Sequence, residues 1–146
     1  MAMLQEGAVM TEFISRSMWF EHRVSYGETD AMQVLYYAEY LHIFERARSF
    51  YIRELGMSYS EVEERGIFLP VREAQCRYRS SARYDDLLQI CLGITVWGRA
   101  SMTFGYEIYD EQKTRHIASG MTQHAFVGPD GVPCKVPAWF KDMVEG

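Results

Sequence analysis

The order of apolar and polar residues predicts one long helix. Over residues 38–55 apolar side chains recur at steps of three and four residues, which places them on one stripe of a helix. No glycine or proline interrupts this segment, and Gly56 follows it, as is typical of a residue just beyond a helix end. The stripe consists of Tyr40, Leu41, Phe44, Ala47, Tyr51 and Leu55.

Alternation of apolar and polar residues predicts the strands. It is clearest over residues 88–96 and recurs over residues 18–26 and 102–108. Residues 97–100 have the composition of a tight hairpin turn, and residues 110–113 form a second turn. Two further extended segments are residues 67–79, where Pro70 indicates a sheet edge or bulge, and residues 114–127, where Gly120 indicates a bulge or a close approach.

Two short helices complete the expected elements. One covers residues 58–64, with Ser58 or Ser60 as cap and Gly66 as terminator, and the other covers residues 137–144 and begins at Pro137. The order strand, long helix, short helix and four strands is typical of an α+β domain. In such a domain a curved antiparallel sheet of about five strands can wrap around the long helix.

The expected domain organisation is simple. We expect a single domain over residues 16–146 and a flexible tail over residues 1–15. An open sheet has unpaired edges, so we also expect self-association as a homodimer or homotetramer.

Composition narrows the classes of function. The net charge of −5 argues against a nucleic-acid binder. The three cysteines, Cys76, Cys91 and Cys134, are widely spaced and form no C-x-x-C motif, which argues against a disulfide framework or zinc site and favours a reducing cytoplasm. No apolar run is long enough to form a transmembrane segment. Aromatic residues make up 14% of the chain, which suits a β-rich core or an aromatic-lined tunnel.

One carboxylate, that of Asp30, lies in an irregular segment between the first strand and the long helix. A helix N-terminus presents N–H groups without partners and a partial positive charge. A carboxylate beside it can act as a general base or a nucleophile. Aspartate is also common in turns and at helix caps, so spacing alone leaves a purely structural interpretation open.

The residues around Asp30 carry a resemblance. It rests on Arg23-Val24, Thr29-Asp30, residues 34–41 and residues 44–48, and it continues through weaker matches at 82–86 and 118–120. Together these resemble the signature of hotdog-fold acyl-CoA thioesterases, in the branch of 4-hydroxybenzoyl-CoA thioesterase and the Tol–Pal-associated acyl-CoA thioesterases. The resemblance spans roughly residues 18–140 and implies a hotdog fold, an acyl-CoA substrate and Asp30 as the catalytic carboxylate. This chemistry needs no metal or redox cofactor.

Two positions depart from the family pattern. Gln33 stands where the family often has glycine, which predicts a difference in the shape of the loop. Tyr37 stands where many Tol–Pal-type members have histidine, whereas the hydroxybenzoyl type resembles this chain in having tyrosine. No general-base histidine is therefore expected at this position. None of the four histidines, His22, His42, His116 and His124, matches the motif.

The other expected site residues follow from the resemblance and from position. Tyr37 would donate its backbone N–H to the thioester carbonyl, and Tyr36 would contact the substrate. Tyr26 would orient Asp30 or a water molecule, or else face the core. Glu45 would reach the acyl pocket or pair with Arg46 or Arg48; we favour the pairing. Ser101 is a candidate contact of the thioester or pantetheine. Candidates for the CoA phosphates are Arg79 and Arg83, with Arg77, Arg99 and Lys135 as further possibilities.

Three alternatives to an acyl-CoA thioesterase stay open. The chain could hydrolyse thioesters of an acyl carrier protein, or it could be a non-catalytic acyl-CoA sensor or assembly protein that kept the fold. A hotdog dehydratase would need a catalytic histidine that the motif lacks. The sequence predicts neither the acyl chain preference nor whether Asp30 acts as nucleophile or base.

Overall fold

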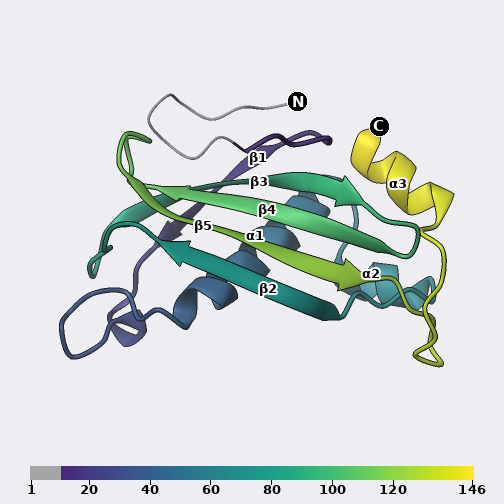
Figure 1. Cartoon of the computed structure of the whole chain (residues 1–146), viewed down its shortest axis with the longest axis horizontal. Coiled ribbons are helices and arrows are strands. Elements are labelled where there is room, and N and C mark those ends of the chain that lie inside the picture. Colours follow the sequence, from purple (N-terminus) through teal and green to yellow (C-terminus); the bar gives the residue numbers. More distant parts are fainter. Residues whose placement is uncertain (1–10) are drawn as a thin grey trace.

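The computed structural model describes residues 11–146 and contains one curved five-stranded sheet, with the long helix α1 lying across one face (Figure 1). The strand order is β1-β3-β4-β5-β2, and all neighbouring strands are antiparallel. This arrangement confirms the predicted α+β fold. The strands are β1 (Met18–Arg23), β2 (Val71–Tyr78), β3 (Leu87–Trp97), β4 (Ser101–Tyr109) and β5 (His116–Ala125), and the helices are α1 (Glu39–Glu54), α2 (Tyr59–Glu64) and α3 (Ala138–Glu145).

The core lies between α1 and the sheet. Phe44 stacks on Tyr106 of β4, with ring centroids 4.1 Å apart, and Tyr51 meets Phe104 edge-on. All four rings are fully buried. A Cβ atom added at Gly120 would lie 2.5 Å from the Phe44 ring, so a glycine is needed there for the helix to approach β5. The close approach predicted at Gly120 is therefore confirmed.

Two predicted boundaries differ from the structure. The first strand ends at Arg23, not at residue 26, because Ser25 and Glu28 form a capping box that turns the chain into a short 3₁₀ helix, η1 (Tyr26–Glu28). The packed structure also begins before residue 16: Phe13 is fully buried, and Ser15 Oγ accepts a hydrogen bond from Ile94 N–H at 2.8 Å. The rest of the predicted tail, residues 1–10, lies outside the described residues.

Two local predictions, the Ser58 cap and an edge or bulge at Pro70, agree with the structure. Ser58 caps α2 and accepts from the Glu61 N–H at 3.2 Å. Strand β2 begins directly after Pro70 and has an irregular register between Val71 and Glu73. The three cysteines are unpaired. Among the helices of residues 11–146, none has the length and apolar character needed to cross a membrane.

Candidate active site

Asp30 lies in a short loop that is closed at its base. Thr29 pairs with Leu35, and the Tyr36 N–H donates to the Glu28 carbonyl oxygen at 2.9 Å. Inside the loop, Asp30 Oδ1 accepts from the Met32 N–H at 2.8 Å and more weakly from the Val34 N–H at 3.4 Å. Within the described residues, Asp30 Oδ2 has no hydrogen-bond partner. The carboxylate is therefore held by one oxygen, while the other is available for chemistry.

Gln33 adopts a left-handed backbone conformation in this loop, with φ of 65°. For a residue with a side chain that conformation costs about 1 kcal/mol, and glycine adopts it readily. The loop thus has the backbone conformation that glycine favours at the position where the family often has glycine.

Helix α1 follows the Asp30 loop and begins without a side-chain cap, and its N-cap residue is Ala38. In the described part of the chain, the N–H groups of Tyr37 and Ala38 donate to no acceptor. The carbonyl oxygen of Tyr37 accepts from the Tyr78 hydroxyl at 2.9 Å, which ties this turn to the end of β2. The helix end therefore offers free donors and the positive end of the helix dipole.

Four tyrosines surround this helix end, and we call them the tyrosine cluster: Tyr36, Tyr37, Tyr40 and Tyr78. The Tyr36 and Tyr37 rings are 4.8 Å apart, and Tyr78 meets Tyr40 edge-on at 4.9 Å. The Tyr36, Tyr37 and Tyr78 side chains are exposed, so the cluster presents aromatic surface at the start of α1. Sequence reasoning missed Tyr78, although it lies at the end of a predicted strand.

Tyr26 and Glu45 do not make the protein contacts predicted for them. Tyr26 is 79% exposed in η1 and meets Tyr84 edge-on, so it neither faces the core nor bonds to Asp30. Glu45 lies 3.5 Å from His42 Nε2. The favoured pairing of Glu45 with an arginine is wrong, because both arginines turn elsewhere. Arg46 lies 3.6 Å from Glu28, and Arg48 is buried and donates to the Tyr106 hydroxyl.

The remaining candidates divide between the two ends of the sheet. Figure 1 shows the Asp30 loop at one end and the β3–β4 turn at the other. Arg83 forms a bridge with Val34 of the loop, and Arg79 follows the end of β2. Ser101 begins β4 at the far end, about 26 Å along the strand from Tyr109 at about 3.3 Å per residue. Arg99 and Lys135 also lie at that far end, where Val136 N–H donates to the Arg99 carbonyl oxygen.

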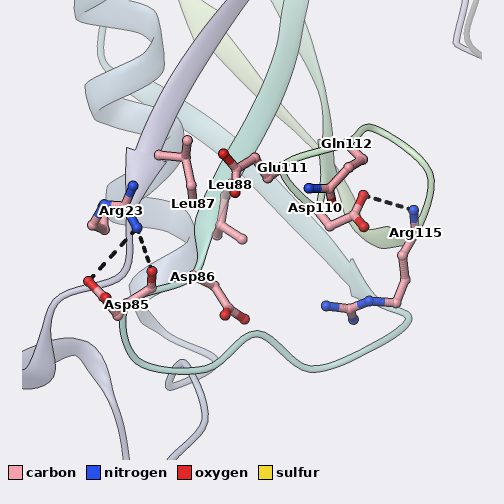
Figure 2. Close-up of a pocket in the computed structure, with 9 residues that line it drawn as sticks. All are labelled: Arg23, Asp85, Asp86, Leu87, Leu88, Asp110, Glu111, Gln112 and Arg115. Carbon is pink, nitrogen blue, oxygen red and sulfur yellow. Dashed lines mark hydrogen bonds and ion pairs between the residues drawn. The ribbon is translucent and has the colours of Figure 1, made fainter.

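A polar pocket of about 270 Å³ lies next to the segment that follows Arg83 (Figure 2). Arg23 donates to the Asp85 carbonyl oxygen at 2.7 Å, and Arg115 donates to Ser80 Oγ and the Ser81 carbonyl oxygen at 2.9 Å each. Both arginines are thus already paired. The pocket is also lined by the carboxylates of Asp85, Asp86, Asp110 and Glu111, so its chemistry disfavours a phosphate.

No histidine in residues 11–146 forms a hydrogen bond or ion pair with the Asp30 carboxylate. Burial lowers the pKa of His124 to about 4, so this residue is neutral near pH 7. His116 lies 2.6 Å from Glu107, and His22 is paired with Glu28. Among the described residues, Asp30 contacts no histidine, and its carboxylate accepts only from backbone amides of its own loop.

The sequence matches a known family. A profile described as the thioesterase-like superfamily matches residues 24–144. A putative esterase from Aquifex aeolicus is 30% identical over 108 residues, which cover 74% of this chain and 83% of that protein. The acyl-CoA thioester hydrolase YbgC of Escherichia coli O6:H1 is 34% identical over 92 residues, which cover 63% of this chain and 69% of that protein.

The fold is also similar to solved structures. The DHNA-CoA thioesterase of Staphylococcus aureus superposes with a TM-score of 0.79 at 30% identity, covering 86% of this chain and 85% of that one. The hotdog fold implied by the sequence resemblance is confirmed.

Proposed function

This chain belongs to the thioesterase-like superfamily, and on that basis we propose that it is a thioester hydrolase acting on acyl-CoA or aroyl-CoA. The observation that carries the proposal is that Asp30, whose Oδ1 accepts from loop amides, lies in the loop leading into the uncapped start of α1, where the N–H groups of Tyr37 and Ala38 have no acceptor among the described residues. The names of the similar proteins, an acyl-CoA thioester hydrolase and a DHNA-CoA thioesterase, support this substrate class.

The proposed mechanism uses these groups in sequence. The thioester carbonyl oxygen accepts from the Tyr37 N–H at the start of α1, where the helix end stabilises the negative charge that develops on the oxygen. Asp30 then either attacks the carbonyl carbon or removes a proton from an attacking water. The carbon–sulfur bond breaks and CoA leaves as the thiolate. On the nucleophilic route, water hydrolyses the resulting acyl–Asp30 anhydride.

Substrate contacts follow from the same geometry. Tyr36 and the other exposed members of the tyrosine cluster are our candidates for contacts with the acyl group or pantetheine. Arg79 and Arg83, at the loop end of the sheet, are our candidates for the CoA phosphates. Ser101 lies too far from Asp30 of its own chain to serve the same site, so the predicted contact would need a second protomer.

The function is tested by measuring release of free CoA from a panel of short-chain, long-chain and aromatic acyl-CoAs. Hydrolysis of at least one of these substrates is the expected result. Parallel reactions with acyl carrier protein thioesters distinguish the carrier-protein alternative. Binding of acyl-CoA without release of CoA would favour a sensor over an enzyme.

We further propose that the protein is a cytoplasmic homodimer paired through the free edge of β2. This strand has eight residues, seven of them exposed, and within residues 11–146 it pairs with β5 alone, on its other side. An edge strand of that length with unpaired N–H and C=O groups is a template for a second strand. The three unpaired cysteines support a reducing compartment.

Proline substitution on β2 tests this interface. Successive residues of a strand direct their N–H groups to opposite sides, so Ala74→Pro and Gln75→Pro remove donors on opposite edges. The variant that loses the N–H directed at β5 should be less stable, because one backbone hydrogen bond between β2 and β5 is missing. The other should stay folded and become monomeric in analytical ultracentrifugation. A protein that is monomeric before substitution, or two folded variants that both stay dimeric, would contradict pairing through β2.

A further inference from the structure

An ionic network around the buried carboxylate of Glu28, which the proposed mechanism does not use, joins residues of the segment that leads into the Asp30 loop to β1 and α1. The Glu28 side chain is only 7% exposed, and His22 Nε2 lies 2.9 and 3.0 Å from its two carboxylate oxygens. The Ser25 N–H donates to the same carboxylate at 2.7 Å, and Arg46 lies 3.6 Å from it. We call these four residues the Glu28 network.

The members of the Glu28 network come from three elements that have to be aligned at the site. His22 belongs to β1, Glu28 to η1, and Arg46 to the second turn of α1. The carbonyl oxygen of Glu28 also accepts from the Tyr36 N–H, which closes the loop that contains Asp30. Glu28 is thus two residues before the carboxylate and bonded to the residue before Tyr37.

Burying the charged Glu28 carboxylate costs free energy, and an exposed capping residue would avoid this cost. Burying a carboxylate is unfavourable unless it is paired and hydrogen-bonded. Burial by itself would raise the pKa of Glu28, but the Ser25 N–H and His22 outweigh it and hold the pKa below its usual value. The carboxylate is therefore ionised in the fold, and its charge-assisted bonds are stronger and more directional than neutral ones.

A second capping box in the same chain lacks these supports. Ser58 and Glu61 make the same pair of hydrogen bonds at the start of α2, but Glu61 is exposed and pairs with no histidine or arginine among the described residues. Capping alone therefore does not require a buried ion pair. The extra contacts of Glu28 are specific to the segment that carries Asp30.

We propose that Glu28 is a positioning residue, which joins β1 and α1 through His22 and Arg46 and so fixes Asp30 relative to the free Tyr37 N–H. This inference rests on the proposed function. Glu28 itself does not touch the reacting atoms. Its contribution is to keep the Asp30 carboxylate and the Tyr37 N–H at a fixed distance from each other. A small error in that distance lowers the reaction rate strongly.

The test is Glu28→Gln with Glu61→Gln as its matched control. Glutamine keeps the size of Glu28 and one oxygen for the Ser25 N–H, but it removes the charge that holds His22 and Arg46. We expect kcat for acyl-CoA hydrolysis to fall about tenfold with KM within about twofold, because substrate contacts are unchanged while the transition state is misaligned. Glu61→Gln should leave both constants unchanged.

A second pair of variants keeps the test decisive if Glu28→Gln does not fold. His22→Gln retains an N–H donor for Glu28, whereas His22→Leu does not. We expect His22→Gln to keep most of the kcat that His22→Leu loses. Equal kcat in the two His22 variants would overturn the proposal. So would a folded Glu28→Gln with kcat within twofold of the unsubstituted enzyme, or an equal loss in Glu61→Gln.

Asp30→Asn in the same assay separates this inference from the proposed function. If the unsubstituted protein does not release CoA, or if Asp30→Asn remains fully active, the proposed function fails. If Asp30→Asn is inactive and Glu28→Gln is fully active, only the positioning role of Glu28 fails.

Discussion

Replacing Asp30 with asparagine is expected to lower kcat for acyl-CoA hydrolysis about a thousandfold, within the range usual for loss of a general base. The asparagine Oδ1 can still accept from the Met32 N–H, so the loop should keep its shape. The amide, however, is neither a base nor a nucleophile at neutral pH. Steady-state kinetics should therefore show a large fall in kcat with little change in KM.

The matched control is Asp85→Asn. Asp85 lies in a neighbouring loop, is exposed, and adopts φ of 71°, a conformation that asparagine tolerates. The kcat of the Asp85→Asn variant should match that of the unsubstituted enzyme. An Asp30→Asn variant with full activity would show that the carboxylate does not carry the reaction.

A single turnover in heavy-oxygen water distinguishes the two roles of Asp30. On the nucleophilic route, ¹⁸O enters the Asp30 carboxylate when water attacks the anhydride at that residue, and mass spectrometry of the peptide detects it. If Asp30 is a general base, the label appears only in the released acid.

Replacing Gly120 with alanine is expected to destabilise the fold by about 2 kcal/mol, the usual cost of overpacking a core. The new methyl group would lie 2.5 Å from the Phe44 ring and 2.7 Å from the backbone oxygen of Gln75. The ring is stacked on Tyr106 and the oxygen belongs to β2, so neither can move freely. Thermal unfolding should show a midpoint about 8 °C lower, at about 4 °C per kcal/mol for a chain of this size.

Gly27→Ala is the control for this prediction. A Cβ at Gly27 has no atom within 4 Å, so its effect on the free energy of unfolding should stay within about 0.5 kcal/mol. In the Gly120→Ala background, Phe44→Leu should restore part of the lost free energy of unfolding, because it removes the ring that the new methyl group contacts. A Gly120→Ala protein as stable as the unsubstituted one would mean that α1 does not approach β5 this closely.

Much of the fold could be predicted because the sequence patterns that indicate each helix and strand involve residues close together in the chain. The three- and four-residue period predicted a helix over residues 38–55, and α1 covers Glu39–Glu54. Alternation over residues 88–96 and 102–108 predicted β3 and β4 within one or two residues of their bounds. The first strand was extended too far, because alternation continues through Ser25 and Tyr26 even though the capping box already turns the chain.

The site was predicted less completely. Asp30 and the helix start are adjacent in sequence, so their proximity could be inferred directly. Glu45 was wrongly paired because helical spacing allows several partners, and the choice depends on which face of α1 packs on the sheet. Arg48 lies on the buried face, and Arg46 faces Glu28, which belongs to a different element.

By itself, the sequence determined the helix, the strands, the candidate carboxylate and the family resemblance, because each depends on residues close together in the chain. Only the tertiary structure decided that Ser101 lies at the opposite end of the sheet, that Tyr78 holds the Tyr37 carbonyl, and that His22 and Arg46 converge on Glu28. The Tyr78–Tyr37 and Arg46–Glu28 contacts join residues of different elements, and His22 meets Glu28 only because the chain turns back after β1. Sheet order and helix packing determine them, and neither can be read from a local period.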